Sequence, residues 1–242
     1  LACRNLVMST HNTDDDFHVN LYGGYLLLKK VQERAGQLRR FIYSSTASVY
    51  GNAPVLPTPE SYYDTTLPYS ASKLSTEHYC KVYNRLHQLP VSILRLSNVY
   101  GPGQVSSNPY CGVVAKFFEA IERGEPLPVY GDGKQTRDFT YIEDAVNALI
   151  AAAVHPHAPG KVFNVGTGIE TSVNDLAREI GALTGRVDYP IVYVTKRPVD
   201  VVNRRCLDAT LLQQTLGWKV NVPLKEGIKR TYEWLRKEGD SA

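Results

Sequence analysis

The 242-residue sequence has no long hydrophobic run and no excess of charge of either sign. It contains no stretch of about 18 apolar residues, which excludes a transmembrane helix. The 27 Lys and Arg against 24 Asp and Glu leave a net charge of +3, and the basic residues are dispersed. This pattern argues against a nucleic-acid-binding surface. We therefore expect a globular, cytoplasmic protein with neither a membrane nor a nucleic-acid partner.

Cysteine is also scarce: Cys3, Cys80, Cys111 and Cys206 lie far apart and form no C-x-x-C pair. A chain of this length buries roughly 70–75% of its unfolded surface, so its core does not need disulfide bonds for stability. The six histidines have no metal-ligand spacing. We expect free, buried thiols of a reducing compartment rather than disulfides or zinc, and no metal site.

Methionine occurs once, as Met8, and residue 1 is leucine. No recognisable start of a domain follows Met8. We therefore expect the chain to be a fragment or a processed form of a longer protein.

Hydrophobic periodicity alternates between helical and strand patterns along the chain. Asn12 or Thr13 is a candidate N-cap for the first helix, Gly36 its candidate stop, and three prolines make 51–67 a loop. Helices are expected near 14–35, 68–87, 112–123, 143–154, 172–183, 208–216 and 224–238, and strands near 41–43, 91–96, 127–130, 161–165 and 190–194. This alternation predicts an α/β fold with a parallel sheet and right-handed crossovers.

The first chemical candidate is a Y-x-x-x-K motif made by Tyr69 and Lys73 near the start of the second helix. Positions i and i+4 share one helical face, so the phenol and the ammonium can meet one ligand together. A lysine beside a phenol lowers the phenol's pKa towards neutrality. Composition alone predicts about one such spacing by chance, and Tyr25 and Lys29 repeat it in an apolar helix.

Polar residues at strand ends strengthen this candidate. Four hydroxyl residues within 44–48 directly follow the strand near 41–43, and Asn98 follows the strand near 91–96. The carboxyl ends of parallel strands line the crevice where open α/β sheets bind ligands. A turn satisfied by its own side chains is the alternative for 44–48, but it is less common for four hydroxyls in one place. The pattern predicts a ligand site at this edge of the sheet.

Six motifs follow one another along the chain: SSTASVYG, PYSASK, RLSNVYGPG, GDGKQTRDFTYIED, FNVGTG and RPVDV. In this order they resemble the extended short-chain dehydrogenase/reductase superfamily and, within it, the NAD-dependent sugar-nucleotide epimerase/dehydratase family, most of all its UDP-glucose 4-epimerase-like members. The resemblance implies a Rossmann-type doubly wound parallel sheet, truncated at its N-terminus, with a smaller C-terminal α/β part. Residues 1–105, with later strands at about 127–165 returning to them, would form a partial NAD-binding domain. Residues 106–242 would mainly bind the sugar nucleotide.

The resemblance also implies catalytic and cofactor-binding roles. Tyr69 would remove the proton of a sugar hydroxyl, while Lys73 would lower its pKa and hydrogen-bond the nicotinamide ribose. Thr46 would relay the proton. Ser44, at the same strand end, and Asn20, on the first helix, would lie near the NAD cofactor.

A second set of residues resembles those that bind the substrate, a nucleotide sugar expected to be UDP-linked. Arg137 and Arg197 would hold the diphosphate, because guanidinium stays charged and grips oxygen atoms in pairs. Asn98 would contact the diphosphate region, and Tyr130 would pack on the base. Asp200 either orients Arg197 or contacts the ligand itself.

The sequence departs from the family at its beginning. Members start with a strand and a G-x-x-G-x-x-G turn that holds the NAD pyrophosphate at a helix N-terminus. This chain has no such motif. A segment of roughly 60–80 residues, about two βαβ units, would be missing. We therefore expect the adenosine half of the cofactor site to lie outside this chain.

Residue choice narrows the implied reaction without fixing it. Dehydratases of the family carry an Asp-Glu pair after the first strand, and its decarboxylases carry a glutamate where this chain has Ser48. Their absence favours epimerisation at C4 through a transient ketone. The alternatives are a keto-sugar reductase or dehydratase that uses NAD or NADP, and a non-catalytic fragment or binding module. In the family, a residue near the position of Arg205 and Cys206 limits the bulk of the sugar at C2. The helices near 14–35 and 69–88 form a four-helix bundle in family dimers, which implies a homodimer.

Overall fold

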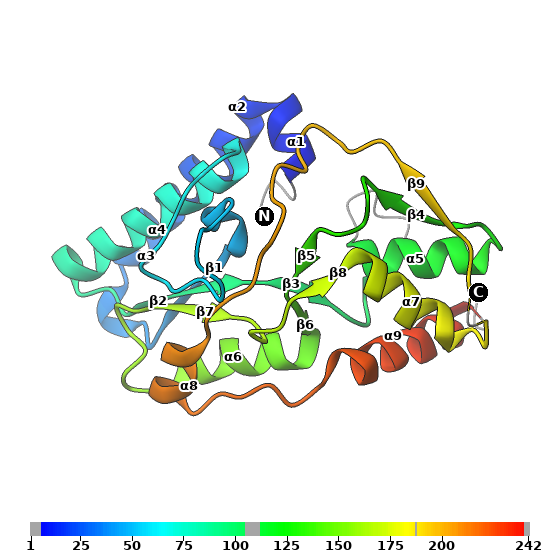
Figure 1. Ribbon diagram of the computed structural model, residues 1–242. Helices are drawn as coiled ribbons and strands as arrows, with labels where there is room; N and C mark the ends of the chain where they lie inside the picture. Colours follow the sequence, from blue (N-terminus) through cyan, green and yellow to red (C-terminus); the bar gives the residue numbers. More distant parts are fainter. Residues whose placement is uncertain (1–5, 105–111, 187, 240–242) are drawn as a thin grey trace.

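The computed structural model describes residues 6–104, 112–186 and 188–239 of the chain and contains a three-stranded parallel sheet (Figure 1). Strands β1 (Phe41–Thr46), β2 (Val91–Leu96) and β7 (Val162–Val165) lie in the order β1-β2-β7. Thr46 pairs with Leu96, and Leu96 with Val165. All three carboxyl ends therefore meet at one edge, as the predicted α/β architecture requires.

Helices cover both faces of this sheet, which explains why β2 is apolar almost throughout. On one face, Ile93 packs in a cluster with Leu28 and Cys80, which come from α3 (Gly23–Gln32) and α4 (Pro68–His87). On the other face, Leu94 packs with Ala148 of α6 (Ile142–Val154) and Leu212 of α8 (Thr210–Leu216). The expected bounds of α4 and β2, 68–87 and 91–96, are confirmed.

A second core lies beside this sheet, to its right in Figure 1. Strands β4 (Leu127–Tyr130) and β9 (Ile191–Val194) pair in parallel. Helices α5 (Val113–Glu122) and α7 (Val173–Leu183) pack on it through buried residues, and α9 (Leu224–Gly239) joins the same cluster.

Short strands that periodicity cannot detect join the two parts. β3 (Asn98–Tyr100) pairs in parallel with β6 (Phe139–Tyr141), and β5 (Thr136–Arg137) pairs antiparallel with β8 (Thr171–Ser172). Of the later strands expected to return to the first domain, β7 does so. β4 pairs with β9 instead. The segment from β9 to α8 crosses back, drawn orange in Figure 1.

The first helical region is more broken than expected. It consists of α1 (Leu6–His11), α2 (Thr13–Asp16), a π-helical turn η1 (Phe17–Tyr22) and α3, and it ends at Gln32, with Gly36 in a separate 3-10 turn, η2 (Ala35–Gln37). Asn12 is the N-cap of α2, because its side chain accepts from the Asp15 N–H at 3.1 Å. The wider turn of η1 presents the Asn20 carbonyl to the Thr76 hydroxyl of α4 at 3.0 Å.

The loop expected at 51–67 contains neither a helix nor a strand, only an isolated bridge from Thr58 to Leu207. A further 3-10 turn, η3 (Ala47–Tyr50), connects β1 to it. Cys80 and Cys206 are buried free thiols, as predicted, whereas Cys3 and Cys111 lie outside the described residues.

Candidate active site

The predicted catalytic pair lies in the first turns of α4, beside the carboxyl end of β1. Pro68 opens the helix, where its missing N–H costs nothing, and Tyr69 follows it. Lys73, one turn later, donates from Nζ to the Ser44 carbonyl at 2.7 Å and lies 4.4 Å from the centre of the Tyr43 ring. The ammonium is therefore fixed at the strand end where the sequence predicted a ligand site.

Burial lowers the pKa of Lys73 to about 8, although the nearby Glu77 carboxylate opposes the shift. Below pH 8 the native state bears the full penalty of a buried ammonium. Above pH 8 the native lysine releases its proton while the unfolded one keeps it up to about 10.5, so this penalty shrinks as the pH rises.

This shift predicts how the stability of a Lys73→Met variant compares with wild type. Between pH 7.5 and 9.5 the wild type is expected to gain about 2 kcal/mol of unfolding free energy relative to Lys73→Met. Urea unfolding of both proteins at the two pH values measures the difference. A difference that is independent of pH would contradict the assigned shift.

Thr46 and Asn20 belong to β1 and η1, two elements that contact α4. The Thr46 hydroxyl donates to Ser48 Oγ and accepts from the Ser48 N–H, both at 3.1 Å, which holds it at the end of β1. Asn20 is buried, and its amide donates to Asp16 Oδ1 at 2.7 Å. Because the Thr76 hydroxyl donates to the Asn20 carbonyl at 3.0 Å, Asn20 lies against α4, at a position three residues after Lys73.

Beneath the pair lies a buried ionic network that the sequence reading missed. Glu77, one turn after Lys73, accepts from Arg95 of β2, with Nη2 to Oε2 at 2.8 Å and Nε to Oε1 at 3.0 Å. Ser45 also donates to Glu77, and Arg95 donates to the Tyr50 hydroxyl at 3.0 Å. The available signal was a lone charge inside the apolar strand VSILRL and a glutamate spaced four residues after Lys73.

The second predicted set also comes together. Arg197 binds both oxygens of Asp200 at 2.7 and 2.8 Å, and its guanidinium carbon lies 4.7 Å from the centre of the Tyr130 ring. Although burial alone would raise it, hydrogen bonds from Arg197 hold the pKa of Asp200 below its ordinary value. Burial lowers the pKa of Arg137, whose charge also interacts with those of Asp200 and Arg197. It donates to the carbonyls of Thr136 and Val202 at 2.7 and 3.1 Å.

Asn98 lies just beyond the end of β2 and is hydrogen-bonded through its backbone to the residue after Arg137. It follows β2 and opens β3, and its N–H donates to the Asp138 carbonyl at 3.0 Å, directly after Arg137 in sequence. Within the described ranges, no group of three or more His, Cys, Asp or Glu could hold a metal ion. No helix in the same ranges is both long and apolar enough to cross a membrane.

Comparison with known proteins assigns the chain to a family. The model of the "NAD dependent epimerase/dehydratase family" matches residues 2–166. The chain belongs to this family. Its cofactor is NAD.

The curated relatives include epimerases and dehydratases. A UDP-glucose 4-epimerase of Mycolicibacterium smegmatis is 36% identical over 223 residues, which are 91% of this chain and 69% of the relative. A human dTDP-D-glucose 4,6-dehydratase is 34% identical, over 90% of this chain and 62% of that protein. The chain thus spans about two thirds of these relatives' length.

Solved structures of the same family superpose closely. The UDP-glucose 4-epimerase of Thermotoga maritima, with UDP-glucose, has a TM-score of 0.90 at 36% identity and covers 98% of this chain and 76% of its own. The UDP-glucuronic acid 4-epimerase of Bacillus cereus, in complex with UDP-glucuronic acid and NAD, has a TM-score of 0.89 at 27% identity and covers 98% and 74%. The Rossmann-type α/β fold is therefore confirmed.

Proposed function

We propose that the protein inverts C4 of a nucleotide sugar through a transient ketone, with Tyr69 as the acid and base. The observation that carries this proposal is the position of Lys73, whose ammonium is tied to the end of β1 by Ser44, one turn after Tyr69 and beside Thr46. An ammonium held there favours the phenolate form of a neighbouring tyrosine.

The donors at this strand end fit the nicotinamide ribose of NAD. Lys73 has three N–H donors, and among the described residues the Ser44 carbonyl takes one of them, which leaves donors for the ribose hydroxyls. Ser44 is exposed and Asn20 lies on the neighbouring helix layer, so both belong to the same proposed subsite. When bound, NAD accepts a hydride from the sugar and returns it.

In the proposed reaction, Tyr69 takes the proton of the C4 hydroxyl as the carbinol is oxidised, and Thr46 relays it through its hydroxyl. The same tyrosine returns the proton after the keto-sugar has rotated and presents its other face. Lys73 keeps the tyrosine in its reactive form and orients the ribose. Oriented groups of this kind contribute typically 10²–10⁴-fold to proton transfer.

The cationic residues of the second set are proposed to hold the diphosphate. The Arg197 guanidinium is oriented before a ligand binds, because Asp200 holds its Nε–Nη2 edge through two hydrogen bonds. The charge of Arg137 interacts with those of Arg197 and Asp200. The Asn98 N–H donates to the carbonyl of Asp138, the residue after Arg137. Tyr130, already stacked by Arg197, offers a flat surface for the base.

Epimerisation is preferred over elimination of water because of the residues after Thr46. Ala47 is buried at 2% exposure and Ser48 is a hydroxyl, so neither supplies the carboxylates that acid–base elimination uses. The alternatives remain a keto-sugar reductase or dehydratase, or a binding module without turnover.

Product analysis separates these reactions. The full-length protein is incubated with NAD and UDP-glucose or UDP-glucuronic acid, and the products are identified by nuclear magnetic resonance. An epimerase gives the C4 epimer with no net consumption of cofactor. A 4-keto-6-deoxy sugar would show a dehydratase, and unchanged substrate with measurable binding would show a binding module. A reductase would instead oxidise added reduced cofactor when a 4-keto nucleotide sugar is supplied as the hydride acceptor.

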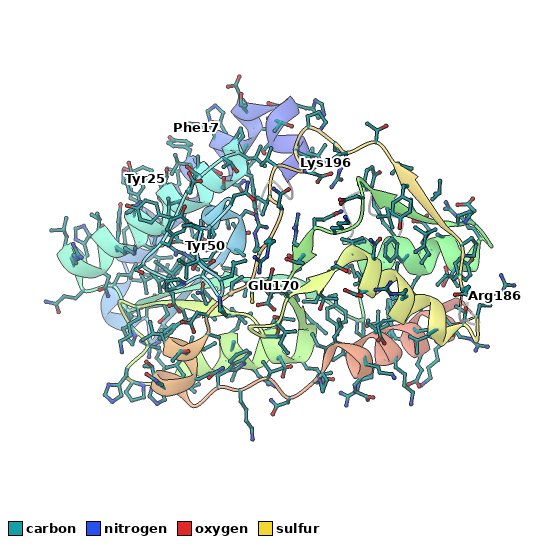
Figure 2. The ribbon with its side chains drawn as sticks, in the orientation of Figure 1. Phe17, Tyr25, Tyr50, Glu170, Arg186 and Lys196 are labelled. Carbon is teal, nitrogen blue, oxygen red and sulfur yellow. The ribbon has the colours of Figure 1, made fainter. Side chains whose placement is uncertain are left out.

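We also propose a homodimer through an exposed apolar helix face, defined by Tyr22, Leu26, Tyr79, Val82 and Leu86. These residues belong to η1, α3 and α4, and their exposed fractions run from 43% to 71%. Figure 2 shows Phe17 and Tyr25 projecting outward from the same helices. An apolar surface of this kind usually marks a protein interface.

A charge placed on this apolar helix face is expected to separate the dimer. In Val82→Glu, a carboxylate would be buried without a partner, and the dimer dissociation constant is expected to rise about 100-fold or more. Light scattering after size-exclusion chromatography measures it. Leu211→Glu, at an exposed position of α8, is the matched control. A monomeric wild type would overturn the proposal.

A further inference from the structure

Arg205 is the one large cation in this region that is buried without a counter-ion among the described residues. It is 8% exposed, and its Nε has no hydrogen-bond partner. The other two arginines of the site differ, since Arg197 is paired with Asp200 and Arg137 donates to backbone carbonyls. A buried polar group without a partner is rare and calls for an explanation.

The nearby carboxylates are already in use. Glu170 pairs with Arg204. Asp138 accepts four hydrogen bonds, two of them from the N–H and hydroxyl of Thr167 at 2.8 and 2.7 Å. Asp200 is held by Arg197. Burial, with Arg137 nearby, lowers the pKa of Arg205 to about 9, so it still carries its charge at neutral pH.

The backbone around Arg205 places it between the two halves of the site. On one side, the Asn203 carbonyl accepts from the Thr136 N–H of β5 at 2.9 Å. On the other side, the Cys206 carbonyl accepts from the Thr58 N–H at 2.8 Å.

Leu207, two residues after Arg205, packs with Ala47, which follows Thr46, and with Leu74, which follows Lys73. Arg205 is therefore flanked by the proposed diphosphate residue Arg137 and by the catalytic strand end. In a bound nucleotide sugar, this interval is where the sugar ring lies.

We propose that Arg205 binds a carboxylate on the sugar, so that the substrate class is a nucleotide-linked sugar acid. This rests on the proposed function, which assigns the diphosphate to Arg137 and Arg197. The planar guanidinium fork matches the two oxygens of a carboxylate. The anion would provide the counter-charge that the described residues do not supply, so neutral sugars would leave the cation without a partner among them.

Calorimetric titration of the full-length protein with UDP, UDP-glucose and UDP-glucuronic acid tests this. Wild type is expected to bind UDP-glucuronic acid about 10- to 100-fold more tightly than UDP-glucose. Arg205→Met is expected to lose this preference while its affinity for UDP stays within about threefold. Arg204→Gln is the matched control, because it removes the neighbouring surface cation and should keep the preference.

Other outcomes overturn the inference in distinguishable ways. Equal affinity of wild type for the two sugars would refute the sugar-acid class and leave the proposed function intact. A loss of UDP affinity in Arg205→Met as large as the loss of UDP-glucuronic acid affinity would make Arg205 a diphosphate residue. Failure of wild type to bind any of the three nucleotides would refute the proposed function together with this inference.

Thermal unfolding without ligand separates binding from a structural role. Because an unpaired buried cation destabilises the fold, Arg205→Met is expected to raise the Tm by about 2–4 °C. A lower Tm would mean that the guanidinium holds the fold and would count against the inference. Arg205→Lys, which keeps the charge but not the planar fork, is expected to retain part of the preference and serves if the methionine variant does not fold.

Discussion

Replacing Tyr69 by phenylalanine is expected to lower turnover of the full-length protein about 10³-fold or more, while the affinity for a nucleotide sugar changes less than about threefold. The change removes only the phenolic oxygen, which is the proposed acid and base. The ring, the helix and Lys73 remain. Measurement of kcat by product analysis and of Kd by calorimetry separates the two effects.

The chain supplies its own control for this experiment. Tyr25 and Lys29 repeat the Y-x-x-x-K spacing on α3, where the Tyr25 ring stacks on Tyr22 and lies tilted against Tyr79. Tyr25→Phe should therefore keep full turnover. If Tyr69→Phe retained more than a tenth of wild-type kcat, the acid–base assignment would be wrong.

The contrast between these two tyrosines shows what sequence reading could do. Spacing alone could not tell Tyr69 from Tyr25, but the ordered motifs around Tyr69 could. The bounds of α4 and β2 were predictable because Pro68 marks a helix start and VSILRL is an apolar run buried on both faces. Tertiary contacts do not override local sequence signals of this strength.

The missed features depend on contacts between distant residues. The strands β3, β5, β6 and β8 have two or three residues each, which is too short to show periodicity, and they exist only because their partners are brought to them. The π turn at Phe17–Tyr22 likewise meets Thr76 on another helix. No local pattern encodes such pairings.

Burial of charge was the other feature that the sequence reading missed. Arg95 lies in the RLSNVYGPG motif, and Arg205 lies only near a position that limits sugar bulk in the family. Among the described residues, Arg95 is buried with a carboxylate and Arg205 without one. Only the three-dimensional neighbours distinguish the arginine that is paired in the core from the one that we propose binds a ligand.

The Glu77–Arg95 pair leads to the second large effect. Their side chains are 0% and 1% exposed, and the N–O distance is 2.8 Å. Glu77→Gln would leave the Arg95 guanidinium buried without a counter-charge, at a cost of about 3–5 kcal/mol of unfolding free energy. Urea unfolding measures this loss. The surface pair of Glu119 and Arg123 is the control, since Glu119→Gln should cost less than about 1 kcal/mol.

A double variant tests whether the cost comes from the uncompensated charge. Glu77→Leu with Arg95→Met removes both charges, and replacing a buried pair by apolar groups is often neutral or nearly so. We expect this variant to be more stable than Glu77→Gln alone, which urea unfolding of the two proteins measures. If the double variant were less stable than either single one, hydrogen bonds to Ser45 and Tyr50 would outweigh the ion pair. Since Glu77 also opposes the lowering of the Lys73 pKa, its loss is expected to move the pH range in which Lys73 deprotonates to lower values.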